Sequence, residues 1–201
     1  TYCARMDPTD PNQLASLASL FQQTLNPEQR KPAEDQIGQL QAQPRFGFLL
    51  LALVQSESTS TAIRLASAIQ FKNLCKTRWN VDAETEDPVF SAISDDEKQA
   101  IRQQLVPVLV SLASASTPSQ AILSQMNESV ALVASSDFPE AWPALIDELV
   151  SQLSTDNHHV LLSVLATSHA IFKQWRSQFR SDALYSEINL VLGKMANPLL
   201  E

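Results

Sequence analysis

Apolar residues recur at intervals of three and four along almost the whole chain of 201 residues. This spacing places them on one face of an α-helix, which completes a turn in about 3.6 residues. The first stretch shows the pattern in Leu14, Leu17, Phe21 and Leu25. Similar stretches succeed one another to the end of the sequence, divided by short turns that carry Pro and Ser. The pattern predicts a chain built from helices alone.

Glycine is scarce in this sequence, which holds three, whereas an average usage near 7% would give about 14. Phosphate-binding loops and dinucleotide-binding turns need glycines where φ is positive or where the backbone approaches a ligand. Turn-dense β-sandwiches need them for the same conformational reason. The composition therefore excludes these classes, while 44% hydrophobic residues suffice to bury a sizeable core.

The periodic stretches predict nine helices. Residues 46–54 form an apolar run that we interpret as a buried helix, because a strand without a partner would leave its backbone groups unpaired. Residues 62–79 form the longest regular stretch before the middle of the chain. The nine predicted helices start near these residues: Pro11, Pro27, Phe46, Ala62, Ser94, Thr117, Asp137, Asp156 and Asp182.

Several helix starts carry capping signals. Asp10 and Asp156 are predicted N-caps of the first and eighth helices. Ser94 and Glu97 have the spacing of a capping box, in which Glu97 reaches back to the backbone of the cap. Because proline removes a helical hydrogen bond, the second helix either begins near Pro32 or kinks there.

Paired helices joined by short turns predict an all-α fold, an α-α superhelix (solenoid) of antiparallel helix pairs with HEAT-like repeats. The second helices of successive pairs open near residues 27, 60, 118 and 157, which is an irregular period. Residues 80–93 account for the longest gap, because they are acidic and show no period, as expected of a loop insertion. The alternative is a globular helical bundle, in which the apolar faces would converge on one core.

Charge and cysteine content limit the partners and the compartment. The net charge of −8 disfavours nucleic acid as a partner, because an acidic chain repels the phosphate backbone. No segment approaches the roughly 18 apolar residues that span a membrane. Cys3 and Cys75 are interpreted as free thiols in a reducing compartment rather than as a disulfide. Residues 1–5 differ in pattern from the rest of the sequence and are interpreted as a non-native or additional extension, and the end of the sequence indicates a fragment of a longer chain.

No arrangement of residues predicts chemistry. His158 and His159 are adjacent and point to different sides of a helix, so they do not predict a metal site. The residue types of a catalytic triad are present in Ser163, His159 and Asp156. They do not predict a hydrolase site, because no part of the sequence supplies an oxyanion hole. We therefore predict no catalytic residue, no metal, no cofactor and no enzyme activity. The larger apolar side chains at helical spacing are assigned to the core between helices, namely Leu65, Phe71, Trp79, Trp142, Phe172 and Trp175.

Two parts of the sequence resemble the importin-β superfamily of nuclear transport receptors. The first consists of residues 30–37 (RKPAEDQI) and 62–74 (AIRLASAIQFKNL), followed by Trp79. The second consists of residues 135–143 (SSDFPEAWP) and 170–182 (AIFKQWRSQFRSD), and it resembles the exportins that return importin-α to the cytoplasm. The resemblance implies an importin-β N-terminal domain over residues 30–107, inside an N-terminal repeat array over residues 6–201.

The resemblance also implies a function. Receptors of this superfamily shuttle between nucleus and cytoplasm, and the exportins bind the GTPase Ran in its GTP form together with cargo, here importin-α, with nuclear pore proteins as further partners. No nucleic acid and no membrane span is expected. The second helices of the first repeats face the GTPase in this superfamily, which implies Ran contacts at Arg30, Asp35, Lys72, Asn73, Lys76 and Glu128. The alternative is a generic HEAT-repeat scaffold or adaptor whose binding does not depend on Ran.

Overall fold

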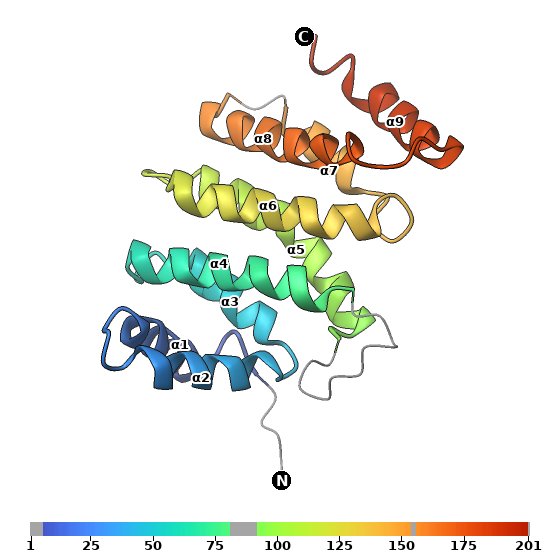
Figure 1. The fold of residues 1–201 in the computed structure, drawn as a ribbon. Coiled ribbons are helices and arrows are strands. Elements are labelled where there is room, and N and C mark those ends of the chain that lie inside the picture. Colours follow the sequence, from blue (N-terminus) through green and yellow to red (C-terminus); the bar gives the residue numbers. More distant parts are fainter. Residues whose placement is uncertain (1–5, 81–91, 154–155, 201) are drawn as a thin grey trace. The chain divides into compact units, whose positions relative to one another are not determined.

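The computed structural model describes residues 6–80, 92–153 and 156–200, and every regular element within them is a helix (Figure 1). The prediction of an all-helical chain is therefore confirmed for the described residues. The predicted extension at residues 1–5, Cys3, and residues 81–91 of the predicted insertion lie outside them. The helices are α1 (Pro11–Thr24), α2 (Arg30–Gln41), α3 (Phe46–Gln55), α4 (Thr61–Arg78), α5 (Asp95–Ala113), α6 (Gln120–Asp137), α7 (Leu145–Ser151), α8 (His158–Trp175) and α9 (Asp182–Met195).

Most helix starts lie within a few residues of their predicted positions. The Asp10 carboxylate accepts the N–H of Asn12 at 2.9 Å, so the predicted cap of α1 is confirmed. Pro32 lies in the first turn of α2, where backbone N–H groups have no acceptor within the helix. The missing N–H of proline therefore costs no helical hydrogen bond there. The predicted cap at Asp156 is wrong by one residue. Asn157 caps α8 instead, because its side-chain oxygen accepts the N–H groups of His159 and Val160.

The predicted helix start at Asp137 is also wrong. Asp137 is the last residue of α6, and residues 138–144 form turns before α7 begins at Leu145. The main-chain oxygen of Asp137 accepts the N–H groups of Ala141 and Trp142 at 2.7 and 2.8 Å. These bonds hold the chain in a compact turn, in which the Phe138–Pro139 peptide is cis. Trp142 therefore precedes a helix rather than lying in one.

The chain divides into two compact units, residues 1–101 and residues 102–201, with the boundary inside α5. In the first unit α1 packs against α2, and α3 packs against α4. Their shared core holds the fully buried side chains of Leu17, Phe46, Leu50 and Phe71. Gly47 permits the close packing of α3, because a Cβ atom there would lie 3.3 Å from Ile101 Cδ1 and 3.4 Å from Leu74 Cδ2.

In the second unit α6 packs against α8, and α7 packs against α9. The α6–α8 contact buries polar as well as apolar groups. Asn127 is 6% exposed, and its Oδ1 accepts the hydroxyls of Thr167 at 2.9 Å and of Ser163 at 3.4 Å. Gln174 adds a third link, because its side-chain N–H donates to the main-chain oxygen of Ala131 at 3.1 Å. Each of these polar groups has a partner, so the network avoids the cost of an unpaired buried donor or acceptor.

The aromatic core prediction is confirmed in part. Phe71, Trp79 and Trp142 are buried. Leu65, Phe172 and Trp175 are only half-buried, so their assignment to the core is wrong. The rings of Phe172 and Trp175 stack with their centroids 4.8 Å apart, and the Trp175 indole N–H donates to the Glu187 carboxylate at 2.9 Å. The indole N–H needs a polar partner, and at this position the partner lies close to the surface.

No helix in the described part of the chain is both long enough and apolar enough to span a bilayer.

Candidate functional site

Helix α4 presents a polar face opposite its buried side. The apolar side is anchored by Ile63, Phe71 and Leu74. On the other side Asn73 and Lys76 are exposed, and Lys72 is half-buried. These three residues lie on neighbouring positions of the helix surface, since residues three and four apart share a face.

Ile69 is a surface residue of α4 that the sequence did not indicate as a contact residue. Its apolar character suggests the buried side of the helix, but it is 39% exposed. It lies four residues before Asn73, and Lys76 comes three residues after that. The helical spacing that joins these positions is present in the sequence. An isoleucine within a polar stripe supplies apolar contact area for a partner, as is typical of the centre of an interface.

The candidates on α2 differ in what their side chains do. Arg30 is the first residue of α2, and its Nε donates to the main-chain oxygen of Thr24 at 3.0 Å. This bond satisfies a carbonyl at the end of α1 and closes the turn between the two helices. Asp35 is exposed on the next turn of α2. Arg30 therefore has a structural role that the sequence did not reveal, whereas Asp35 is available for contact.

Glu128 is the one candidate in the second unit. It is exposed on α6, one residue after the buried Asn127. The other five candidates, Arg30, Asp35, Lys72, Asn73 and Lys76, belong to the first unit. All six remain predictions of partner contacts.

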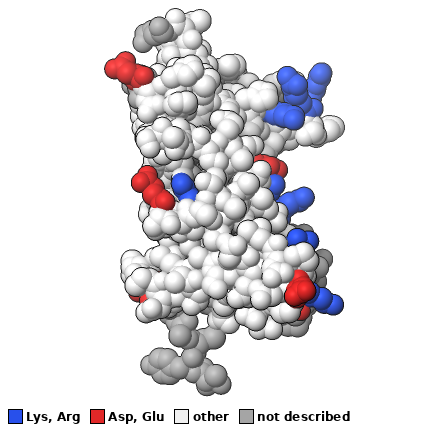
Figure 2. All heavy atoms as spheres, turned by 90° about the vertical axis from the view of Figure 1, so that its left-hand side faces the viewer, with Lys and Arg blue, Asp and Glu red and all other residues white. Residues whose placement is uncertain are grey.

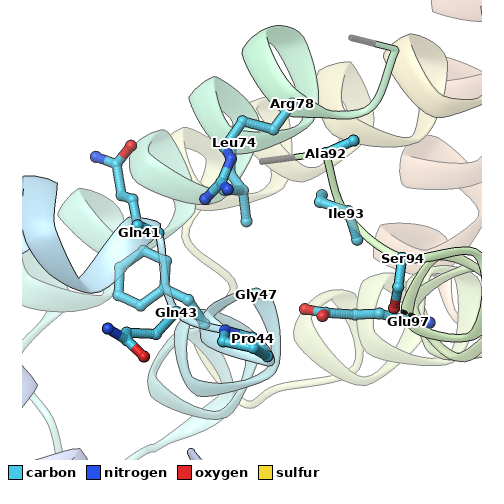
Figure 3. A pocket seen from close by; sticks show the side chains of 12 residues that line it. Gln41, Gln43, Pro44, Gly47, Leu74, Arg78, Ala92, Ile93, Ser94 and Glu97 are labelled. Atoms are coloured by element: carbon cyan, nitrogen blue, oxygen red, sulfur yellow. Dashed lines mark hydrogen bonds between the residues drawn. The ribbon is translucent and has the colours of Figure 1, made fainter. Parts of the chain in front are cut away.

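A small cavity lies at the C-terminal end of α4, between the α2–α3 turn and the start of α5 (Figure 3). Its volume is about 100 Å³. The side chains of Arg78 from α4 and Glu97 from α5 point toward this cavity. Arg78 is only 4% exposed, so the guanidinium lies among protein atoms. This group of residues fixes the end of the helix that carries Lys72, Asn73 and Lys76.

Glu97 links three segments around the cavity. Ser94 Oγ accepts the Glu97 N–H at 3.4 Å, as the predicted capping box requires. The second half of that prediction is wrong, because the Glu97 carboxylate accepts the N–H of Arg45 at 3.1 Å. Arg45 precedes α3 with φ 68°, a left-handed conformation that is unfavourable for a residue with a side chain. The hydrogen bond from Glu97 helps hold this conformation, and it joins residues 52 apart in sequence.

Burial controls the ionisation of these groups. Burial raises the pKa of Glu97 above its ordinary value of 4.5, while the Arg45 N–H and the charges of Arg45 and Arg78 act in the opposite direction. Burial lowers the pKa of the Arg78 guanidinium, and the Glu97 charge opposes that effect. Each charge thus compensates part of the desolvation of the other.

We expect Glu97→Gln to stabilise the chain at pH 7 by less than about 1 kcal/mol. Because the pKa of Glu97 is higher in the folded chain, its favourable contribution is present below pH 4.5 and is lost as the pH rises through the raised value. Glutamine avoids that loss and keeps an oxygen for the Arg45 N–H. Urea melts of both proteins at pH 7 and pH 4 measure the effect. A variant less stable than the parent at pH 7 would show instead that the charge pair with Arg78 is favourable overall.

The residues considered for chemistry are not arranged for it. Ser163 is buried, and its hydroxyl is bonded to Asn127, whereas His159 and Asp156 are exposed. Over residues 6–80, 92–153 and 156–200, no three His, Cys, Asp or Glu side chains are close enough to hold a metal ion. Cys75 is a buried free thiol, and burial raises its pKa far above the ordinary value.

Comparisons with known proteins agree with the helical architecture. Residues 33–111 match the family model of the importin-beta N-terminal domain, and residues 171–201 match the Cse1 family model. Exportin-2 of Drosophila melanogaster is 34% identical over 198 residues, which are 98% of this chain and 19% of that protein. The importin alpha re-exporter of Saccharomyces cerevisiae is 35% identical over 187 residues, which are 93% of this chain and 18% of that protein.

The chain carries an importin-beta N-terminal domain and, at its end, a Cse1 segment. A solved structure, that of the exportin Cse1 in its cargo-free, cytoplasmic state, matches with a TM-score of 0.80 and 33% identity over 93% of this chain and 19% of that one. This likeness confirms the predicted fold class, an α-α solenoid of HEAT-like helix pairs. The relatives are much longer than this chain, which spans 19% of the length of the Drosophila protein and of the Cse1 chain.

Proposed function

We propose that this chain is the N-terminal part of a nuclear export receptor that binds Ran in its GTP form. With the rest of such a receptor, it carries importin-α from the nucleus to the cytoplasm. The chain contributes binding surface and no catalytic step. Its partners are therefore Ran-GTP and importin-α, and its place of action alternates between nucleus and cytoplasm.

The observation that carries the proposal is the likeness to exportins along nearly the whole chain. Two yeast relatives, from Saccharomyces cerevisiae and Schizosaccharomyces pombe, are named importin-alpha re-exporters and are 35% and 33% identical. The likeness covers both the importin-beta N-terminal match and the Cse1 match. A generic scaffold would not need to retain both segments.

The exposed face of α4 supports the Ran part of the proposal. It combines the positive charge of Lys76, the amide of Asn73 and the apolar surface of Ile69 on one side of a helix whose opposite side is fixed in the core. A rigid helix with a mixed polar and apolar stripe loses little conformational entropy when a partner binds. Such a surface suits a folded protein partner better than a small ligand.

A pull-down with Ran loaded with GTP or GDP tests the function directly. We expect retention of Ran-GTP and little retention of Ran-GDP. Equal retention of both forms, or of neither, would favour a scaffold without Ran dependence.

We expect the double substitution Lys72→Glu and Lys76→Glu to weaken Ran-GTP binding about tenfold or more at 0.1 M salt, where only charges within about 10 Å act strongly. Helicity and the urea midpoint should be unchanged, because Lys76 is exposed and Lys72 is half-buried. The conservative pair Lys72→Arg and Lys76→Arg keeps both charges and is the matched control. If the glutamate variant keeps both its fold and its affinity, this face of α4 does not contact Ran. Asp35 and Glu128 would then be the remaining candidates for Ran contacts.

A further inference from the structure

Positive charge in the second unit is confined to a few places. Residues 103–172 contain no Lys or Arg, and the five basic residues of residues 102–201 are Arg102, Lys173, Arg176, Arg180 and Lys194. Arg102 pairs with Asp137, and Lys194 Nζ lies 2.7 Å from Asp147 Oδ2. The remaining three, Lys173, Arg176 and Arg180, are exposed. They lie within eight consecutive residues, at the end of α8 and in the turn after it. The structure gives none of these three a carboxylate partner in the described part of the chain.

Phe179 lies among these cations and is 90% exposed. An exposed phenylalanine contributes nothing to the core, and the neighbouring Phe172 and Trp175 show that this segment can pack its aromatic rings. We define the basic-aromatic patch as Lys173, Arg176, Phe179 and Arg180. Figure 2 shows a group of basic side chains on this unit that stands apart from the acidic ones.

The backbone on both sides of Phe179 is held by hydrogen bonds. The N–H groups of Ser177 and Gln178 donate to the main-chain oxygens of Gln174 and Trp175 at 3.1 and 3.3 Å, which extends the end of α8 by a turn. On the other side Ser181 caps α9 by accepting the Leu184 N–H at 3.2 Å. The exposed ring is thus presented on a short span between two ordered ends.

Two acidic residues lie near the patch in sequence, and both have local roles. Glu187 accepts the Trp175 indole N–H at 2.9 Å. Asp182 is the first residue of α9, where the helix dipole favours a negative charge. The cations in the last turn of α8 also complement its dipole, but that effect explains neither Arg180 beyond the helix nor the exposed ring of Phe179.

We propose that the basic-aromatic patch binds an acidic segment of a partner protein that carries an apolar side chain next to its carboxylates. The three cations supply charge complementarity, and Phe179 supplies a rigid apolar contact of the kind enriched at interface centres. A protein segment is favoured over nucleic acid, because the chain as a whole is acidic and repels a polyphosphate at longer range. The proposal does not depend on Ran binding through α4.

The test measures binding of a fluorescein-labelled peptide, Glu-Asp-Leu-Glu-Asp-Leu, to the 201-residue chain by fluorescence anisotropy at 0.1 M salt. We expect Arg176→Glu with Arg180→Glu to weaken binding about tenfold, and Phe179→Ala to weaken it several-fold, with unchanged helicity. Lys31→Glu, at an exposed position of α2 in the other unit, makes the same change in net charge as Arg180→Glu alone. It is the matched control and should bind the peptide like the parent, whereas Arg180→Glu should weaken binding several-fold. Because Ran is absent from the assay, failure here leaves the proposed Ran binding untouched.

Three outcomes would overturn the proposal. Equal losses in Arg180→Glu and Lys31→Glu would show a response to net charge rather than to this patch. No binding of the acidic peptide, or binding equal to that of its Gln-Asn-Leu-Gln-Asn-Leu counterpart, would exclude charge recognition. Tighter binding of a labelled single-stranded oligothymidylate than of the acidic peptide, lost in the same variant, would assign the patch to nucleic acid instead.

Discussion

Truncation of Trp142 to Ala is expected to destabilise the second unit by about 3–5 kcal/mol, the usual range for removal of a large buried aromatic ring. Trp142 is 4% exposed in the turn between α6 and α7, and its backbone N–H is bonded to the Asp137 carbonyl. Burial raises the pKa of the Glu148 carboxylate, and the Trp142 side chain acts in the opposite direction. Urea unfolding followed by circular dichroism measures the loss.

Trp175→Ala is the matched control for this variant, because Trp175 is half-buried and its loss should cost clearly less. Trp142→Phe keeps most of the apolar volume and should recover much of the stability. A loss of under about 1 kcal/mol for Trp142→Ala would mean that the surrounding side chains collapse into the space or that the ring is not buried in solution.

Removal of the guanidinium in Arg102→Ala is expected to cost about 3–5 kcal/mol, because it removes the positive charge that compensates a buried carboxylate. Arg102 Nη1 contacts Asp137 Oδ2, and the two side chains are 14% and 10% exposed. Asp137 is the last residue of α6, where the negative end of the helix dipole disfavours a carboxylate whose charge is not compensated. The same urea melts provide the measurement.

The double variant Arg102→Met with Asp137→Leu separates the contribution of the ion pair from the cost of a buried charge that is no longer compensated. Replacing both partners of a buried ion pair with apolar side chains is often close to neutral, so this variant should be much more stable than Arg102→Ala. If the double variant is as unstable as the single one, the pair contributes through its geometry at the α6–α7 turn rather than through charge compensation.

Local sequence signals predicted the helices and most of their starts, because periodicity and capping act over a few residues. The apolar run at residues 46–54 was assigned correctly to α3, since a lone strand would have no hydrogen-bond partner. The error at Asp156 has a physical reason, because Asp and Asn are equally good caps and only the chain path selects Asn157. The turn at residues 138–144 was missed, since Pro139 is compatible with a helix start as well as with a turn.

The surroundings of the candidate surface were harder to predict, because they depend on contacts between distant residues. The role of Glu97 shows this, since its partner Arg45 is 52 residues away and a local capping box was the nearest interpretation. Arg30 likewise bonds to Thr24, which no spacing rule indicates. The helix face that Ile69 shares with Asn73 and Lys76 follows from the spacing, but the apolar side chain of Ile69 indicated burial, and only the structure shows that it is exposed. Which of these residues touch a partner depends on a second surface that this chain does not contain.

The bonds that join Asn127 to Thr167 and Ser163 have a consequence for how α6 and α8 can move against each other. Leucine and valine side chains tolerate sliding by a helical turn, because one apolar contact replaces another. A one-turn slip here would carry the Asn127 amide away from both hydroxyls and into apolar surroundings. These hydrogen bonds therefore resist translation of α6 along α8 but still permit small rotations between the two helices. We therefore expect bending of this part of the chain to begin at neighbouring contacts that are purely apolar. The backbone amides at those contacts should exchange hydrogen faster than the amides of α6 and α8 near Asn127.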